Sequence, residues 1–242
     1  MEHYSTLAFV LKQEPTKEQD RNYTFYTQKF GKLALLATGS RKINAKLSGH
    51  LELPSLAQIQ FTMSHKPRLI SALEKFSFSE IKKKKKPLAV AFLMTDLTDK
   101  LSLEKQADPE IWKLLFNTLY FLEENLNQFP QIVDFIWFYF SAQFLEILGL
   151  SPFLEGCAEC GRTTNNKFFS FEKKGIVCQQ HSQKDDWPMN ANQKRVLYKL
   201  FNFSLQQFSE PSCIQEVLEE KKYIEKFLNK FTLVIKSDII IL

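Results

Sequence analysis

The sequence has little of what marks several classes of protein. Glycine occurs 7 times and proline 9 times in 242 residues, which excludes collagen-like chains and chains made mainly of linkers. The uncharged apolar segment Phe135–Leu145 has 11 residues, well short of the roughly 20 that a membrane-spanning helix needs. The N-terminus has neither the basic segment nor the apolar core of a secretory signal. We therefore expect a cytoplasmic protein without a membrane span.

The motifs of common enzymes are also missing. Gly31-Lys32 lacks the preceding glycine and the following Ser or Thr of a phosphate-binding loop, and no dinucleotide-binding fingerprint occurs. His50-Leu51-Glu52 has the form of a zinc-deaminase motif, but it lies far from the cysteines, and no proline precedes Cys157. We therefore predict that the protein is not an enzyme.

Charge is distributed unevenly along the chain. Residues 1–86 carry 16 Lys and Arg against 7 Asp and Glu, a net charge of +9, whereas residues 87–242 carry 16 against 20, a net charge of −4. Charged residues make up 24% of the chain and hydrophobic residues 44%, as in ordinary globular proteins. The basic excess is therefore local, and it predicts that the N-terminal third binds a polyanion.

The first 80 residues alternate between short segments rich in β-branched, aromatic and leucine residues and turns that contain glycine or proline. Six segments fit strands: Thr6–Lys12, Asn22–Thr27, Lys32–Ala37, Leu51–Leu53, Ala57–Met63 and Arg68–Phe78. Five or six strands of this length predict a small β-barrel. Among small barrels the OB-fold often binds oligonucleotides, so we predict an OB-fold nucleic-acid-binding domain over residues 1–80.

Beyond residue 86 the apolar residues recur every three to four positions, which is typical of helices. Asp108 and Pro109 form a helix N-cap and first turn, and Gly149 ends the helix that begins at Pro130. Helical spacing also covers Leu88–Leu97, Asn190–Phe203 and Ser212–Phe231. We predict a helical domain over residues 81–242, and hence an α+β fold. The run Lys82–Lys86 is interpreted as a flexible connector, because like charges repel and stay solvated.

Three of the four cysteines have the spacing of metal ligands. Cys157-x2-Cys160 and Cys178-x2-His181 are separated by seventeen residues, and a hairpin over Thr164–Val177 would bring the two pairs together. Three thiolates and one imidazole close a tetrahedral Zn²⁺ site without an open position for water or substrate. We predict a structural zinc in an insertion over residues 153–186. The alternative is that these residues are reduced and bind no metal.

Cations and aromatic residues lie close together in the basic third of the chain. In a strand, Tyr23 and Phe25 share one face and Tyr26 lies on the other, so some of these rings must belong to the core. Whether any of them stacks on a nucleic-acid base stays open. We predict that five cations contact the phosphate backbone of DNA: Lys29, Lys32, Arg41, Lys42 and Lys46.

Short motifs follow one another in a recognisable order. They are Thr27–Lys32, Thr38–Lys42, Phe144–Pro152, Cys157–Gly161, Phe169–Phe171, Lys174–Cys178 and Ile235–Ser237. In this order they resemble the RecO family of bacterial DNA repair proteins. The chain departs from the family at Lys174-Gly175, where two glycines are frequent, and at His181, where a cysteine is frequent.

The resemblance implies a recombination mediator without enzymatic turnover. Members bind single- and double-stranded DNA, anneal complementary strands, engage RecR and the C-terminal tail of single-stranded DNA-binding protein (SSB), and help to load the RecA recombinase. This implies a cytoplasmic protein associated with the nucleoid.

Two alternatives come from other classes. An RNA-binding protein of transcription or translation with an OB-fold and a zinc ribbon would need the same charges, because phosphate contacts do not distinguish RNA from DNA. In an interaction scaffold, the basic charge would serve solubility alone.

Overall fold

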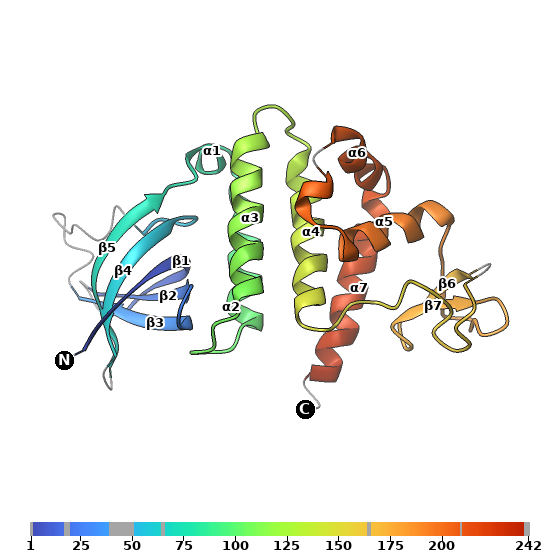
Figure 1. Ribbon diagram of the computed structural model, residues 1–242, viewed down its shortest axis with the longest axis horizontal. Helices are drawn as coiled ribbons and strands as arrows, with labels where there is room; N and C mark the ends of the chain where they lie inside the picture. The colour runs from blue at the N-terminus through green and yellow to red at the C-terminus, as the bar shows by residue number, and fades with distance from the viewer. Residues whose placement is uncertain are drawn as a thin grey trace. The chain divides into compact units, whose positions relative to one another are not determined.

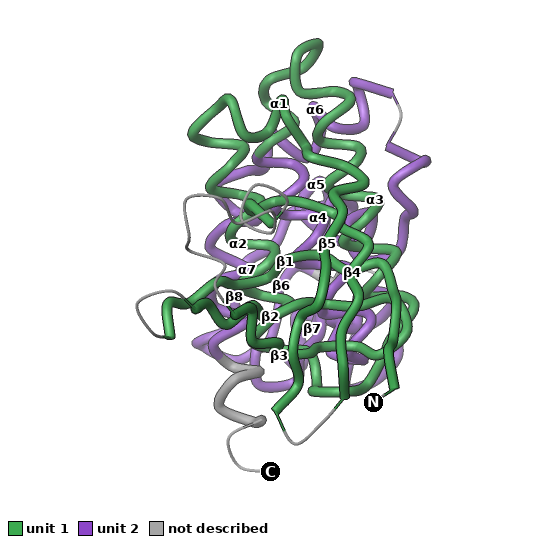
Figure 2. Tube along the Cα trace, turned by 90° about the vertical axis from the view of Figure 1, so that its left-hand side faces the viewer, with its two compact units in different colours: residues 1–133 green, residues 134–242 purple. Residues whose placement is uncertain are grey.

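A computed structural model shows a mixed α+β protein, as predicted. It describes residues 2–16, 20–38, 51–63, 66–163, 166–208 and 210–239. A β-barrel near the N-terminus is followed by helices and a small second sheet (Figure 1). The chain forms two compact units, residues 1–133 and 134–242 (Figure 2). The first unit contains helices as well as the barrel, and the predicted domain boundary at residue 80 stays a prediction.

Five strands close into a barrel in the order β1-β2-β3-β5-β4. They are β1 His3–Pro15, β2 Arg21–Thr27, β3 Gly31–Ala37, β4 Leu56–Thr62 and β5 Arg68–Phe76. β1 pairs antiparallel with both β2 and β4, whereas β3 and β5 meet in parallel at Leu36 and Arg68. This order is consistent with the predicted OB-fold, a five-stranded Greek-key barrel.

The sixth predicted strand, Leu51–Leu53, is wrong. This segment pairs with none of the strands in the described part of the chain. Leu51 is instead fully buried in the barrel core. Pro54 follows at once and has no N–H group for a ladder, so the apolar residues here reflect burial rather than strand pairing.

The alternation of β1 and β2 places side chains on two buried faces. Tyr23 and Phe25 lie in the barrel core, stacked with their ring centroids 5.9 Å apart. Phe9 lies on the other face, where its ring centroid is 5.0 Å from that of Trp112. Both faces are therefore covered, which explains why almost the whole of 6–11 is buried.

Three helices complete the first unit: α1 Ser79–Lys82, α2 Lys85–Leu101 and α3 Pro109–Asn125. α2 packs against β1 and β2 and is longer than the predicted Leu88–Leu97. The start of α3 is as predicted. The Asp108 side chain accepts hydrogen bonds from the N–H groups of Glu110 (2.8 Å) and Ile111 (3.4 Å), and Pro109 occupies the first turn.

The interpretation of Lys82–Lys86 as a flexible connector is wrong. α1 ends within this run and α2 begins within it. Lys82 pairs with Glu74 at 3.6 Å, and the Lys84 ammonium donates to the Asn127 side chain at 2.7 Å. These partners offset the mutual repulsion that would keep the run extended.

The second unit contains four α-helices and a short 3₁₀ helix among its described residues. They are α4 Ile132–Ile147, whose first two residues belong to the first unit, α5 Ala191–Asn202, η2 Leu205–Phe208, α6 Pro211–Glu219 and α7 Lys221–Ile239. The single helix predicted over Ser212–Phe231 is therefore wrong, because the chain turns at Glu220. The turn lets α6 bury Val217 and α7 bury Ile224 and Phe227 as separate faces. Within the described ranges no helix has the length and apolar character to cross a membrane.

Candidate metal centre and nucleic-acid interface

The predicted insertion over residues 153–186, together with Trp187 and Pro188, contains a small sheet in the second unit and is called the cysteine module below. Its strands are β6 Asn166–Ser170, β7 Gly175–Cys178 and β8 Trp187–Pro188, in the order β7-β6-β8. β6 and β7 pair antiparallel, so the predicted hairpin is confirmed where it is described. Cys178 ends β7, and the His181 N–H donates to the Cys178 carbonyl at 3.0 Å. This turn presents the second pair of candidate ligands.

A second tight turn presents Cys157 and Cys160. The Cys157 N–H donates to the Arg162 carbonyl, and its own carbonyl accepts from the Gly161 N–H, both at 2.8 Å. Gly161 has a φ of 71°, which a residue with a side chain rarely adopts. A Cβ atom on Gly156 would lie 2.7 Å from the Gly161 carbonyl oxygen. The turn therefore requires both glycines.

The two turns bring all four predicted ligands together. The Sγ atoms of Cys157, Cys160 and Cys178 and a ring nitrogen of His181 lie within 4.8 Å of one another. His181 Nδ1 is 3.2 Å from Cys178 Sγ and 3.7 Å from Cys157 Sγ. A tetrahedral zinc ion requires sulfur–nitrogen separations of roughly 3.6 Å. The cluster therefore fits a closed site for a metal of this type.

The surroundings of Cys157 favour its thiolate. Burial raises the pKa of this thiol, but the backbone N–H groups of Cys178, Cys160 and Glu159 and the His181 side chain lower it by more, to about 6. The pKa of Cys160 is raised, because burial and the neighbouring Cys157 and Cys178 outweigh the Arg162 N–H that lowers it. Thiolates are the species that bind metal ions, so the surroundings of Cys157 favour the form of this side chain that could bind one.

Aromatic rings attach the module to α7, a feature that the ligand spacing did not predict. The ring centroids of Phe169 and Phe227 are 4.8 Å apart. The Lys230 ammonium lies 4.4 Å from the ring centroid of Phe171 and 4.7 Å from that of Trp187. These are cation–π contacts on two rings of the module. Phe227 and Lys230 at helical spacing were the only signal in the sequence.

The five predicted DNA-contacting cations have different surroundings. Lys29 is exposed in the turn between β2 and β3. The Lys32 ammonium donates to the Asp99 carbonyl at 2.5 Å and is 3.7 Å from the Asp99 carboxylate, with 15% of its side chain exposed. Arg41, Lys42 and Lys46 lie outside the described residues. Whether the five act together on DNA stays a prediction.

The three aromatic rings of β2 belong to the core. Tyr23, Phe25 and Tyr26 are fully buried. The Tyr26 hydroxyl donates to the Asp108 carbonyl at 3.2 Å and accepts from the Asp108 N–H at 3.1 Å. Burial raises the Tyr26 pKa to about 12. The packing alternative is confirmed for all three rings, and none of them is placed to stack on a base.

The comparison with known proteins covers both units, and the boundary between the two matching family models lies within the first unit. The family model described as "Recombination protein O N terminal" matches residues 1–81, and that described as "Recombination protein O C terminal" matches residues 86–231. The "DNA repair protein RecO" of Listeria monocytogenes serotype 4b (strain CLIP80459) is 29% identical over 227 residues, which cover 93% of this chain and 86% of the relative. That of Bacillus mycoides (strain KBAB4) is 24% identical, covering 93% and 88%. The chain thus belongs to the RecO family of DNA repair and recombination proteins.

Proposed function

We propose that this protein is a recombination mediator that binds single- and double-stranded DNA and anneals complementary strands without enzymatic turnover. It would also help to load RecA on SSB-coated DNA together with RecR. The observation that carries the proposal is the N-terminal barrel. Its strand order is consistent with an OB-fold, its part of the chain holds the basic excess, and the chain belongs to the RecO family.

DNA binding in this proposal is mainly electrostatic. Lys29 is exposed at one end of the barrel, and Arg41, Lys42 and Lys46 follow β3 in the chain. Because the rings of β2 are buried, cations rather than base stacking would supply the affinity. Lys32 would contribute fully only if it released Asp99. Two strands whose phosphates are neutralised repel each other less, which favours annealing.

The cysteine module would hold a structural Zn²⁺. Cys157, Cys160, Cys178 and His181 are the proposed ligands, and their closed set leaves no position for a substrate. The ion would cross-link the turn that carries Cys157 and Cys160 to the turn that carries Cys178 and His181. Its contribution is therefore to folding, and no step of annealing passes through it.

Annealing of two complementary DNA strands tests the proposal. The rate is followed by fluorescence on bare and on SSB-coated strands, with purified protein and no nucleotide. We expect acceleration in both cases, and we expect Arg41→Glu/Lys42→Glu to weaken DNA binding and slow annealing. Lys226→Glu/Lys184→Glu makes the same change of charge at exposed lysines in the second unit and is the first control.

The outcomes separate the alternatives. If the Arg41→Glu/Lys42→Glu variant binds DNA at low salt as tightly as the unchanged protein does, the proposed contacts are contradicted. RNA of equal length that displaces DNA would favour the RNA-binding alternative. Absence of any DNA binding would favour the scaffold. RecA loading is tested separately, as the rate of filament formation on SSB-coated single strands with and without RecR.

A further inference from the structure

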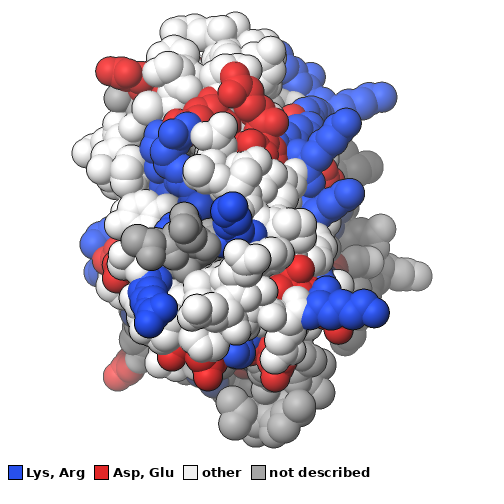
Figure 3. Space-filling view, turned by 90° about the vertical axis from the view of Figure 1, so that its right-hand side faces the viewer, with Lys and Arg blue, Asp and Glu red and all other residues white. Residues whose placement is uncertain are grey.

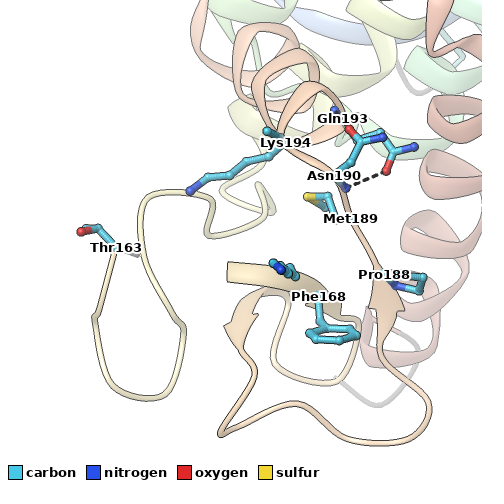
Figure 4. Close-up of a pocket in the computed structure, with 9 residues that line it drawn as sticks. Thr163, Phe168, Pro188, Met189, Asn190, Gln193 and Lys194 are labelled. Atoms are coloured by element: carbon cyan, nitrogen blue, oxygen red, sulfur yellow. Dashed lines mark hydrogen bonds between the residues drawn. The ribbon is translucent and has the colours of Figure 1, made fainter. Parts of the chain in front are cut away.

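A groove in the second unit is unexplained by the barrel or the metal cluster. It has a volume of about 850 Å³, close to the largest pockets that hold a small molecule. One wall is the module, through Thr163, Lys167 and Phe168, and the other is the start of α5, through Lys194. In Figure 4, Lys194 reaches from the first turn of α5 toward the segment that carries Thr163.

The groove combines an apolar lining with two cations. Phe168, Pro188 and Met189 contribute apolar surface, and none of the described residues that line the groove is acidic. Within the described residues, the side-chain ammonium groups of Lys167 and Lys194 have no hydrogen-bond or ion-pair partner, whereas their backbone groups bond to Met189 and Asn190. In contrast, Lys173 and Lys199 elsewhere in the unit pair with carboxylates at 2.6 and 2.5 Å. The two groove lysines are therefore available to an anion.

Asn190 and Gln193, which also line the groove, are hydrogen-bonded to each other. The Asn190 N–H donates to the Gln193 side chain at 3.0 Å, and the Gln193 N–H donates to the Asn190 side chain at 2.8 Å, which closes the N-terminus of α5. The Gln193 amide also donates to Glu220 at 3.2 Å. The groups that remain for recognition are the two ammonium groups, the Thr163 side chain and the apolar lining.

These features suit a nucleic-acid strand better than a peptide. A lysine ammonium group acts as a point charge and does not form the bidentate pair that arginine makes with a carboxylate. None of the described residues that line the groove is an arginine. β6 is paired on both sides, by β7 and β8, so it offers no free edge for an added peptide strand. Figure 3 shows Lys and Arg side chains projecting from this side of the molecule, with acidic side chains in its upper part and also along its lower edge.

We infer that this groove binds the backbone of single-stranded DNA and is a second DNA contact apart from the barrel. The inference rests on the proposed function in DNA binding. Lys167 and Lys194 hold phosphates from opposite walls, and the apolar lining accommodates a sugar or base. Because Phe168 packs against Cys157 and Cys178, the metal cluster keeps one wall of the groove in place.

Salt-dependent binding tests the groove. The variant Lys167→Gln/Lys194→Gln removes two charges, and Lys184→Gln/Lys226→Gln is the matched control at exposed lysines outside the groove. The affinity for a fluorescent single-stranded oligonucleotide is measured by anisotropy at several salt concentrations. Loss of two phosphate contacts should reduce the slope of log affinity against log salt by about 1.4 for a single strand. The control should keep the slope of the unchanged protein. Thermal unfolding and zinc content show that each variant is folded.

Each outcome bears on the groove separately from the barrel. If the unchanged protein binds DNA and the groove variant keeps its slope, the groove inference is overturned while the proposed function stands. If the unchanged protein binds no DNA, both are overturned. If the groove variant loses binding of an acidic peptide but not of DNA, the groove takes a peptide and the inference is overturned.

Photo-crosslinking locates the strand directly. A photoreactive residue in place of Thr163, which is exposed and lines the groove, should crosslink to bound single-stranded DNA. The same residue in place of Asn202, at the other end of α5, is the control. Crosslinking that is absent at Thr163, or no stronger there than at Asn202, would overturn the inference.

Discussion

Glu123 is a single buried residue that holds a short helix. Its carboxylate accepts hydrogen bonds from the N–H groups of Glu80 (2.8 Å) and Ile81 (3.0 Å) at the start of α1. The residue before α1, Phe78, has a left-handed φ of 49° and makes no side-chain cap. α3 therefore supplies the cap that the helix itself lacks.

Replacing Glu123 should weaken this junction. We expect Glu123→Ala to lower the free energy of unfolding by about 1–3 kcal/mol, because one buried and one partly buried N–H group lose their acceptor. Glu124→Ala, at an exposed neighbour in the same helix, should change it by less than about 0.5 kcal/mol. Urea denaturation measures both. Equal effects of the two substitutions would contradict the capping role.

Gly31 is required by both its backbone conformation and its surroundings. Its φ is 65°, and a Cβ atom would lie 2.1 Å from the Gln106 carbonyl oxygen. Gly149 has a similar φ of 69° but no atom within 4 Å of a Cβ. A side chain at Gly149 would therefore cost only the free energy of the left-handed backbone conformation. A side chain at Gly31 would cost that free energy and, in addition, that of steric overlap with Gln106.

Alanine at these two positions should have unequal effects. Gly149→Ala should cost about 1–2 kcal/mol, the cost of a left-handed conformation. Gly31→Ala should cost a further 1–3 kcal/mol or more, because the backbone at Gln106 must move. The comparison is made by thermal unfolding of the two variants. A Gly31→Ala protein as stable as Gly149→Ala would rule out the close approach.

The contrast between Lys29 and Lys32 gives a further prediction at this scale. Lys29→Gln should reduce the salt slope of single-stranded DNA binding by about 0.7, which corresponds to one phosphate contact. Lys32→Gln should change the slope less and stability more, because Lys32 is held by Asp99. Anisotropy titrations and urea denaturation distinguish the two. A larger change of slope for Lys32 would show that it releases Asp99 for DNA.

At the scale of elements, the cysteine module depends on two turns and on its attachment to α7. Its sheet is small, and β8 contains only two residues. Buried apolar contacts from Phe169 to Phe227 join it to the helix. A small sheet of this kind buries little surface, so a metal cross-link has a large effect on its stability.

Loss of one ligand should therefore release both the metal and the module. We expect Cys157→Ser to abolish stoichiometric zinc and to make residues 153–186 sensitive to protease. Cys213→Ser, outside the cluster, should keep the metal, and His181→Cys should keep it because thiolate is an equally good ligand. Zinc analysis and limited proteolysis are the measurements. A zinc-free Cys157→Ser protein with a protease-resistant module would refute the structural role.

At the scale of the whole molecule, the barrel and the helices that follow it share one core. Phe9 contacts Trp112 of α3, and the Tyr26 hydroxyl bonds to Asp108 just before that helix. Residues 1–133 form one compact unit for this reason. The barrel strands alone would expose one of their two apolar faces.

Fragments of the first unit test this dependence. A fragment of residues 1–128, which includes α3, should unfold cooperatively. A fragment of residues 1–80 should aggregate or lack cooperative unfolding. Without α3, the side chains of Phe9 and Tyr26 on the outer face of the barrel become exposed to solvent. Thermal unfolding followed by circular dichroism distinguishes them. A cooperative transition in the shorter fragment would show that the barrel is a domain by itself.

Much of the fold could be predicted because it depends on residues that are close together in the sequence. Five of the segments predicted as strands from their apolar residues and turns overlap β1 to β5, and Asp108-Pro109 forms the N-cap and first turn of α3. The spacing of the cysteines and His181 predicted the ligand cluster, because each pair is local to one turn. The prediction at Leu51–Leu53 was wrong because apolar residues can be buried without pairing as a strand, and that at Lys82–Lys86 because its lysines have partners elsewhere in the chain. The single helix over Ser212–Phe231 was wrong because the helical spacing continues across the turn at Glu220.

The sequence by itself determined the α+β class, the family and the clustering of three cysteines with His181, since all three depend on local pattern and order. Only the tertiary structure decided that Tyr23, Phe25 and Tyr26 are all core, and that Lys32 bonds to a residue 67 positions away. It also decided that Lys167 and Lys194 line one groove. The physical reason is that such contacts join residues far apart in the chain, so they exist only once the elements have packed.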